Sequence, residues 1–205
     1  NSYSTSEYYK TNAEFLTSDA KKFKANLETE FKIYDQVEKF LQKNIKSEFS
    51  VVSRITKPAV KSPAAPFTTS TLQQEASRKL SFSVSKTMTL AQRLYESGLI
   101  TYMRTDSVNL SNEAKSQAKA EILRRFGEQY YNGKDYKNKS SNAQEAHEAI
   151  RPTNFKVQNI NADFDQKRLY ELIWKRTISS QMSQAKLERT KLKVGSNTHE
   201  NLFIA

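Results

Sequence analysis

The two ends of this 205-residue chain carry the alternation of β-strands, whereas its middle carries the periodicity of helices. Apolar and polar side chains alternate over residues 7–33, around a turn at Ser18-Asp19, and another strand is predicted at 49–55. Alternation returns at 190–194, followed by a last strand at 199–204. These late strands need a sheet, and the only other predicted sheet is N-terminal. The middle of the chain is therefore predicted to be inserted into one β-rich domain.

One helix is expected inside the β-rich domain. Asp35 and Glu38 have the spacing of a capping box, which predicts a helix start at Asp35 and an end near Lys46. Four apolar residues at helical spacing predict its buried face: Val37, Phe40, Leu41 and Ile45.

A proline-containing segment separates the two regions. Residues 57–66 hold three of the four prolines, which is typical of an extended connection, and we place the domain boundary near residue 62. The predicted fold class is α+β. A discontinuous β-rich domain of residues 1–61 and 188–205 would enclose a mainly α domain of residues 62–187.

Helix signals dominate the inserted domain. A cap at Thr69 or Ser70 precedes a helix over 72–80, and a second helix over 85–97 ends at Gly98. A helix, a turn, a second helix and then an extended segment indicate a winged-helix-like arrangement, a class that often binds DNA.

Two more helices are predicted further along the chain. Ser111 caps one that continues to Phe126, just before Gly127. Asp165 is predicted to cap a long amphipathic helix reaching about Gln184, and the single tryptophan of the chain, Trp174, is expected in its core face.

The composition limits the classes of function. A net charge of +11 and a pI near 9.6 favour a polyanionic partner, and nucleic acid is the commonest one. No cysteine is present and there are two histidines, so a disulfide framework and a thiolate metal site are excluded. The sequence has no apolar run of membrane-spanning length and no signal-peptide pattern, so a cytoplasmic location is expected.

The stretch GLITYMRTDS, residues 98–107, carries the candidate chemistry. If it is extended, Ile100, Tyr102 and Arg104 share one face, with Thr101 and Met103 on the other. A phenol with an ordinary pKa of about 10 is a weak nucleophile at neutral pH, and a fixed guanidinium both favours its ionisation and binds phosphate. On spacing alone, a half-buried strand with an exposed arginine explains the pattern equally well.

Three stretches of sequence together carry a resemblance to a known family. They are APFTTSTLQQEA at 65–76, the 98–107 stretch, and EAHEAIRPT at 145–153. In this order they resemble the motifs of type IA DNA topoisomerases, most closely the bacterial members. The family places a tyrosine-bearing domain within a β-rich hinge domain, so the resemblance implies the same insertion that the strand pattern predicts.

The resemblance also implies roles for individual residues. Tyr102 would be the nucleophile that cuts one DNA strand and stays joined to its 5′ phosphate, and Arg104 would orient that phosphate. His147 and Arg151, four positions apart and predicted on one face of a helical turn, would contact DNA phosphate near the tyrosine. Thr101 and Ser107 are predicted as further DNA-binding residues.

The family uses Mg²⁺, and its acidic metal-binding domain matches nothing in this sequence. Asp163 and Asp165 precede a helix and are interpreted as capping residues. We therefore predict a fragment without a metal site, inactive by itself, whose partners are single-stranded segments of negatively supercoiled DNA and the acidic domain of the same polypeptide. Within the cytoplasm, association with the nucleoid is expected.

Two other classes of function remain open on the sequence alone. The first is a non-catalytic winged-helix DNA-binding module in which Tyr102 only packs, and the second is an interaction module of the replication machinery with no DNA affinity. Covalent trapping of DNA separates the enzyme from both alternatives, because only the enzyme forms a tyrosyl adduct.

Overall fold

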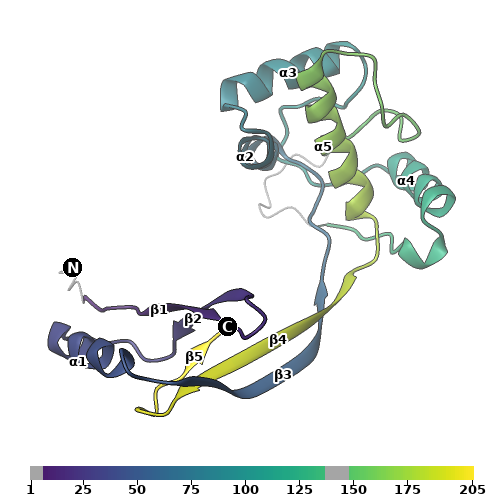
Figure 1. The fold of residues 1–205 in the computed structure, drawn as a ribbon. Coiled ribbons are helices and arrows are strands. Elements are labelled where there is room, and N and C mark those ends of the chain that lie inside the picture. Colours follow the sequence, from purple (N-terminus) through teal and green to yellow (C-terminus); the bar gives the residue numbers. More distant parts are fainter. Residues whose placement is uncertain (1–6, 137–147) are drawn as a thin grey trace, which may run out of the picture. The chain divides into compact units, whose positions relative to one another are not determined.

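The computed structural model describes residues 7–136 and 148–205 (Figure 1). The chain divides into two compact units. The strand-rich unit comprises Asn1–Ala59 and Lys186–Ala205, and the helical unit comprises Val60–Ala185. The helical unit is thus inserted in sequence between the two parts of the other, and the predicted mixture of helices and strands is confirmed.

The strand-rich unit is built on a five-stranded sheet with the order β1-β2-β5-β4-β3. Its strands are β1 (Asn12–Leu16), β2 (Lys22–Leu27), β3 (Phe49–Lys61), β4 (Ala185–Ser196) and β5 (Phe203–Ile204). β1 and β2 form the predicted antiparallel hairpin, and β5 pairs antiparallel with both β2 and β4. The late strands therefore join the N-terminal sheet, as their need for partners predicts.

Aromatic rings fill the core of this sheet. The ring of Phe15 meets those of Phe23, Phe49 and Phe203 with centroids 5.2–5.5 Å apart. Such tilted and edge-on contacts are the favourable geometries for aromatic pairs. Burial of these rings holds the first and last strands of the chain together.

The helix of this unit, α1 (Tyr34–Asn44), begins two residues earlier than predicted from a cap at Asp35. Its N-cap is Ile33, which makes no side-chain capping bond, so the predicted capping box of Asp35 and Glu38 is wrong. Asp35 lies in the first turn instead, where a carboxylate favours the helix dipole. Of the predicted apolar face, Phe40 is buried, whereas Leu41 and Ile45 are exposed.

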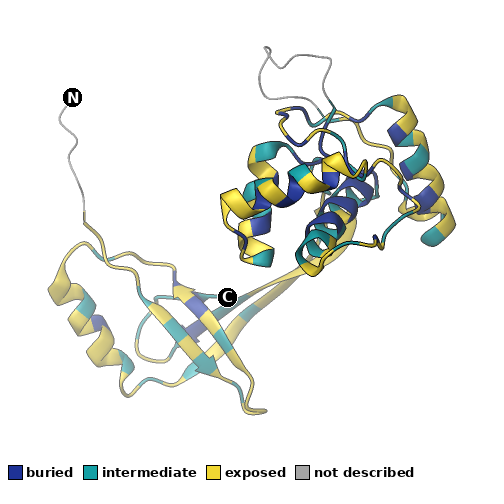
Figure 2. Cartoon of the chain, turned by 90° about the horizontal axis from the view of Figure 1, so that it is seen from above, coloured by how far each residue is buried: buried dark blue, intermediate teal, exposed yellow. Residues whose placement is uncertain are grey.

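The described part of the helical unit contains four α-helices and a short 3-10 helix. They are α2 (Thr69–Leu80), α3 (Val84–Glu96), α4 (Asn112–Arg125), the 3-10 helix η1 (Glu128–Tyr130) and α5 (Phe164–Ser180). Figure 2 shows that α5 is the most deeply buried of these helices, and it contacts α2, α3 and α4. The core of the unit is therefore organised around α5.

Two aromatic residues of α5 show how the surrounding loops are held. Trp174 is buried, as predicted, and its indole N–H donates to the carbonyl of Phe155 (2.8 Å). The hydroxyl of Tyr170 donates to the carbonyl of Val157 (2.6 Å), and burial raises the pKa of this phenol to about 12. Both rings thus anchor the loop that leads into α5.

Ser111 caps α4 as predicted, whereas the caps of α2 and α5 differ from the predicted ones by one or two residues. α2 is capped by Thr68, in a capping box with Thr71, and α5 by Asp163, in a box with Gln166. Asp165, the predicted cap of α5, forms an ion pair with Lys86 instead (2.5 Å). Where several residues that favour the N-cap are adjacent, the sequence does not show which of them begins the helix. The structure decides this, because the N-cap residue has an extended backbone.

The winged-helix-like description is not confirmed. A wing is a strand hairpin, and the described part of the helical unit contains isolated bridges in its place. These bridges join Phe67 to Ile150, Ile100 to Pro152, and Tyr131 to Met182.

Candidate active site

The 98–107 stretch begins at a well-formed helix end. Gly98 has a φ of +68°, and its N–H donates to the carbonyl of Tyr95 (2.8 Å) while that of Leu99 donates to Leu94 (2.9 Å). This pair of bonds is a Schellman motif, which needs the left-handed backbone that glycine adopts without strain. Gly98 therefore ends α3 as predicted and sets the direction of the next residues.

Beyond Gly98 the chain bends at Leu99, Thr101 and Met103, and it is not part of a sheet. On one side, Ile100 bridges Pro152, and the N–H of Thr101 donates to the carbonyl of Arg151 (2.9 Å). On the other side, the N–H of Thr69 at the start of α2 donates to the carbonyl of Thr105 (2.9 Å). We call residues 99–105 the tyrosine loop.

Two threonine hydroxyls complete the attachment of the tyrosine loop. The Thr69 hydroxyl donates to the carbonyl of Met103 (2.8 Å) and accepts from the N–H of Thr105 (2.9 Å). The Thr101 hydroxyl donates to the carbonyl of Ala149 (2.7 Å) and accepts from the N–H of Arg151 (2.9 Å). The three stretches that carry the family resemblance are thereby tied into one local structure.

Side chains alternate along the second half of this segment. Tyr102 and Arg104 are exposed, whereas Met103, Thr105 and Ser107 are buried. Tyr102 and Arg104 are therefore both accessible to solvent, which their predicted common face requires. Ile100, predicted on that same face, is buried and is an exception.

Tyr102 is exposed and still held in place. It retains 44% of its accessible surface, and its ring packs edge-on against that of Tyr95, with centroids 5.2 Å apart. The hydroxyls of Tyr136 and Tyr170 donate to backbone carbonyls, but that of Tyr102 has no hydrogen bond to any described residue. Tyr102 therefore presents a positioned and unengaged phenol.

Arg104, two residues after Tyr102, is an exposed cation. Within the described chain its guanidinium forms no hydrogen bond or ion pair, unlike Arg151, which binds Glu148, and Arg176, which binds Glu75 (3.0 Å). A guanidinium offers five donors in a planar fork suited to phosphate. Arg104 thus keeps that capacity for a ligand.

Thr101 and Ser107, two predicted DNA contacts, lie in structural positions. The Thr101 hydroxyl is used in its bonds to Ala149 and Arg151. Ser107 is fully buried, and its hydroxyl accepts from the N–H of Asn109 (3.1 Å). Because Ser107 has no exposed surface, this structure does not support a DNA contact by its side chain.

Arg151 is not on the predicted helical turn, and His147 lies outside the described residues. Residues 148–152 are extended, because Ile150 and Pro152 bridge Phe67 and Ile100. The described residues 148–152 therefore do not form the predicted helical turn.

Arg151 donates two bonds to one carboxylate oxygen of Glu148 (2.7 and 3.2 Å), whose other oxygen accepts from the N–H of Ser111 (2.6 Å). Burial alone would raise the pKa of the Glu148 carboxyl, but these hydrogen bonds outweigh it and hold the pKa below its ordinary value. Glu148 therefore joins the end of the 145–153 motif to the cap of α4.

Thr69 and Glu148 are the site residues that sequence reasoning missed. The sequence pattern indicates only a helix cap at Thr69, although an adjacent pair of threonines offers one hydroxyl for the cap and one for another task. Glu148 lies inside the third motif, but its partners Arg151 and Ser111 are brought together only by the fold.

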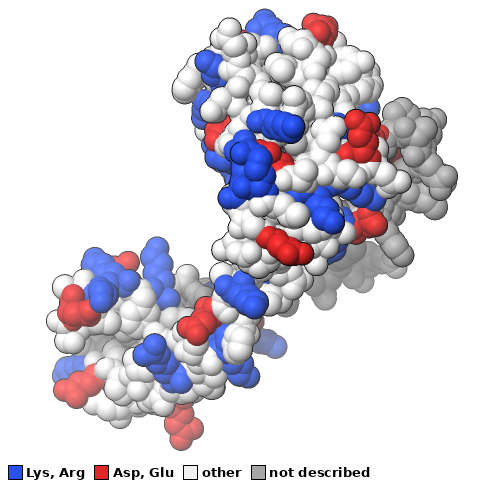
Figure 3. All heavy atoms as spheres, turned by 90° about the vertical axis from the view of Figure 1, so that its right-hand side faces the viewer, with Lys and Arg blue, Asp and Glu red and all other residues white. Residues whose placement is uncertain are grey.

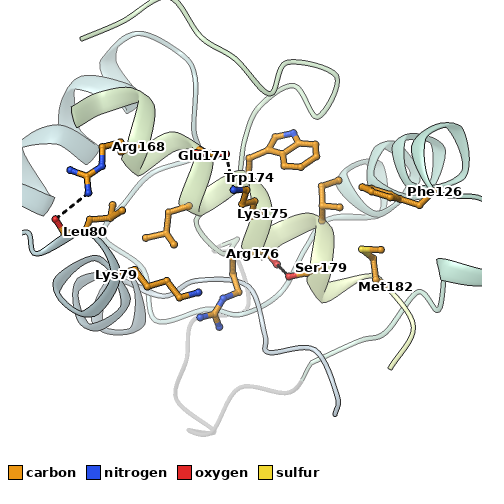
Figure 4. Close-up of a pocket in the computed structure, with 12 residues that line it drawn as sticks. Lys79, Leu80, Phe126, Arg168, Glu171, Trp174, Lys175, Arg176, Ser179 and Met182 are labelled. Carbon is orange, nitrogen blue, oxygen red and sulfur yellow. Dashed lines mark hydrogen bonds and ion pairs between the residues drawn. The ribbon is translucent and has the colours of Figure 1, made fainter. Parts of the chain in front are cut away.

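A groove of about 500 Å³ beside α5, shown in Figure 4, is a separate feature. Apolar side chains such as Leu172 line it together with basic residues that already have partners. Lys175 pairs with Glu171 (2.7 Å), and Arg176 pairs with Glu75. No residue of the 98–107 stretch lines this groove, so it does not contribute to the candidate active site.

The described residues do not fit a magnesium site. Within 7–136 and 148–205, no three His, Asp or Glu side chains gather into a group that would hold a metal ion. Asp163 caps α5 as interpreted from the sequence, and Asp165 is paired with Lys86. In the same part of the chain, no helix is both long and apolar enough to cross a membrane.

Comparison with known proteins now identifies the family. A family model described as DNA topoisomerase matches residues 1–204. The chain belongs to the type IA DNA topoisomerases. DNA topoisomerase 1 of Zymomonas mobilis is 52% identical over 165 residues, which cover 79% of this chain and 14% of that protein. For DNA topoisomerase 1 of Escherichia coli the identity is 47% over 156 residues, 74% of this chain and 18% of that protein.

A solved structure agrees with the family assignment. Full-length topoisomerase I from Thermotoga maritima superposes with a TM-score of 0.72 at 35% identity, over 97% of this chain and 33% of that one. This topoisomerase chain therefore spans a minor part of the length of the relatives it matches.

The pKa of Glu148 yields a prediction about stability. A carboxyl with a lowered pKa in the folded state stabilises that state above its unfolded pKa, near 4.5, and loses this contribution as the pH falls through the folded pKa. Glu148→Gln should therefore lower the free energy of unfolding at pH 7, and the difference from the unmodified chain should shrink below about pH 4.5. Urea titrations at several pH values measure both quantities.

Glu128→Gln is the matched control, because Glu128 is exposed and forms no ion pair within the described chain. A Glu148→Gln difference that stays constant from pH 7 to pH 3 would contradict the assigned role of the carboxylate.

Proposed function

We propose that this chain supplies the nucleophile for transient cleavage of one DNA strand. In the intact enzyme Tyr102 would form a 5′-phosphotyrosine link, another strand would pass through the break, and religation would leave negatively supercoiled DNA relaxed. The observation that carries this proposal is that Tyr102 and Arg104 are both exposed on a loop tied to both neighbouring motifs, and that neither side chain has a hydrogen bond or ion pair to any residue within 7–136 and 148–205.

The chemistry is an exchange of one phosphodiester for another. The phenolic oxygen of Tyr102 bonds to phosphorus as the bond from phosphorus to the 3′ oxygen breaks, the phenol gives up its proton and the leaving 3′ oxygen gains one. Religation is the reverse reaction. Because the ester bond is conserved as a tyrosyl ester, resealing needs no ATP.

Arg104 would act on the phosphate rather than on the phenol. Negative charge builds up on the phosphate oxygens as the new bond forms, and a guanidinium fixed two residues from the nucleophile stabilises that charge. Since Arg104 has no protein partner within the described chain, it loses no existing ion pair on binding DNA.

The tyrosine loop would contribute pre-organisation. A nucleophile held in one orientation avoids the entropy cost of being positioned at each turnover. Backbone bonds on both sides of the loop and the packing of Tyr102 on Tyr95 supply that restraint. The buried Met103 side chain keeps Tyr102 and Arg104 facing outward.

Further DNA contacts belong to the same proposal. His147 would bind a phosphate near Tyr102, whereas Arg151, engaged with Glu148, would position the 145–153 motif and reach DNA with its remaining donors. Thr101 would contribute indirectly, because its hydroxyl is bonded to the backbone of Ala149 and Arg151 and so helps to hold the tyrosine loop in place.

We propose that the magnesium of the intact enzyme is held by an acidic domain outside this chain, because the described residues provide no site for it. That acidic domain of the same polypeptide would be its protein partner, and a single-stranded segment of DNA its substrate.

Replacement of Tyr102 by phenylalanine tests the nucleophile. In a full-length DNA topoisomerase 1 containing this sequence, Tyr102→Phe should abolish the covalent DNA adduct trapped by denaturation and leave DNA binding within about twofold, because only the attacking oxygen is lost. Tyr95→Phe is the control, since it removes a hydroxyl from the ring that packs against Tyr102. Undiminished adduct in Tyr102→Phe would exclude the assignment and leave a DNA-binding module in which Tyr102 only packs.

Arg104 can be tested by separating cleavage from binding. Arg104→Ala should slow single-turnover cleavage by about 100-fold, the scale of losing one donor to developing charge, while the Kd for DNA rises only a few-fold. Arg93→Ala, at an exposed arginine of the same unit, should change neither by more than about twofold. Equal losses of cleavage and binding in Arg104→Ala would make this residue a simple DNA contact.

A further inference from the structure

The groove beside α5 follows one face of that helix for about three turns. Six of the α5 residues that line it each lie three or four positions from another of the set: Arg168, Glu171, Leu172, Lys175, Arg176 and Ser179. A rise of about 1.5 Å per residue gives this stretch a length of about 16 Å. Figure 4 shows Leu80 near Arg168 at one end of the groove, and Phe126 with Met182 at the other. We call this feature the α5 groove.

Part of the apolar lining of the α5 groove is open to solvent. Leu80, Leu172 and Met182 are half-buried and pack on the core of the helical unit. Phe126, at the end of α4, retains 41% of its accessible surface. Removal of such apolar surface from water is favourable, so the groove is suited to receive apolar side chains of a partner.

Cations outnumber carboxylates beside this apolar surface. The carboxylate of Glu75 faces three cations, Arg78 (2.5 Å), Lys79 (3.3 Å) and Arg176 (3.0 Å). Lys79 and Arg176 line the α5 groove, whereas Arg78 does not. Because one carboxylate cannot neutralise three cations, this cluster keeps positive charge that a further acidic group can meet.

The start of α5 has a similar excess of positive charge. Asp165 pairs with both Lys86 (2.5 Å) and Arg168 (3.6 Å), and Arg168 lines the groove. Among the described residues that line the groove, the only acidic one is Glu171, which pairs with Lys175 (2.7 Å). Basic side chains also gather into clusters on the face of the helical unit that Figure 3 shows. The α5 groove therefore favours a partner that is both apolar and acidic.

An acidic amphipathic helix fits these features better than a nucleic acid does. A DNA strand carries a phosphate at every nucleotide and would place some of them against Glu171 and the apolar lining. A helix can direct apolar side chains to the lining and carry carboxylates only at the positions that face the cations. About three turns of such a helix match the length of the groove.

We propose that the α5 groove binds an amphipathic helix of a partner protein, with acidic residues beside its apolar face. Apolar side chains three and four positions apart would pack on Leu172 and Phe126, and carboxylates beside them would face Lys79 and Arg176. No residue of the tyrosine loop lines the groove. This surface is therefore separate from the candidate active site, and its proposed role does not rest on that of Tyr102.

A designed peptide serves as the probe. A fluorescein-labelled helical peptide of about 14 residues, with leucines three and four positions apart on one face and glutamates beside them, is titrated with a full-length DNA topoisomerase 1 containing this sequence. A peptide of the same composition with its leucines scattered around the helix is the control. Fluorescence anisotropy should show the amphipathic peptide binding at least about tenfold more tightly. Equal binding of both peptides, or binding of neither, would overturn the proposal.

The apolar contact is tested at the end of α4. Phe126→Ala should weaken binding of the amphipathic peptide by at least about fivefold, because the exposed ring becomes buried against the peptide. Leu123→Ala is the matched control, since Leu123 lies on the same helix, is 38% exposed and does not line the groove. It should change the affinity by less than about twofold, and equal losses in the two variants would exclude the groove as the binding site.

The charge contact is tested at the Glu75 cluster. Lys79→Gln should weaken binding about threefold at low salt and less at high salt, because salt screens the attraction. Arg78→Gln removes another cation paired with Glu75, but from a residue outside the groove, so binding should stay nearly unchanged. An equal loss in Arg78→Gln would show that only net charge matters and would contradict the proposed position of the carboxylates.

Two further measurements exclude other occupants of the α5 groove. A single-stranded oligonucleotide of about 20 nucleotides should not displace the peptide, and displacement would make the groove part of the DNA-binding surface instead. Peptide binding by the 205-residue chain but not by the full-length enzyme would show that the rest of the polypeptide covers the groove, and would overturn the assignment to a partner protein. Thermal unfolding of each variant checks that the fold is retained.

Discussion

Two threonine hydroxyls are the interactions on which the candidate active site depends. The tyrosine loop has no helix or sheet of its own, yet the hydroxyls of Thr69 and Thr101 each donate to a backbone carbonyl and accept from a backbone N–H. Buried backbone groups left without partners would be costly. The same four bonds that satisfy the backbone also fix the outward direction of Tyr102, so stability and presentation of the nucleophile have one physical origin.

The fold is predictable where the signal is local and repeated. Alternation indicates the β1-β2 hairpin, and the late strands β4 and β5 can be placed because strands need partners. The end of α3 at Gly98 and the cap of α4 at Ser111 are predicted correctly, whereas the caps of α2 and α5, where several capping residues are adjacent, are not. The winged-helix description rests on the order of elements alone, and the segment after α3 is a loop held by isolated bridges.

The site is predictable to the extent that it obeys the two-residue period of an extended chain. That period pairs Tyr102 with Arg104, but it misplaces Ile100, because the bridge to Pro152 turns this residue into the core. The spacing of His147 and Arg151 predicts a helical turn, whereas residues 148–152 are not helical and Arg151 is held by Glu148. Contacts with residues outside the repeating pattern decide the direction of such side chains. The periodicity of the sequence carries no information about those contacts.

Removal of one hydroxyl beneath the tyrosine loop tests whether these bonds present the nucleophile. Thr69→Val keeps the shape of the side chain and leaves the N–H of Thr105 unpaired, which should cost about 1–3 kcal/mol of unfolding free energy. Well below the unfolding temperature, a full-length enzyme with Thr69→Val should cleave DNA at least about tenfold more slowly and bind it normally. The control Thr89→Val, at an exposed threonine on α3, should leave both unchanged. Normal cleavage by a destabilised Thr69→Val enzyme would contradict the claim that this hydroxyl presents Tyr102 for attack.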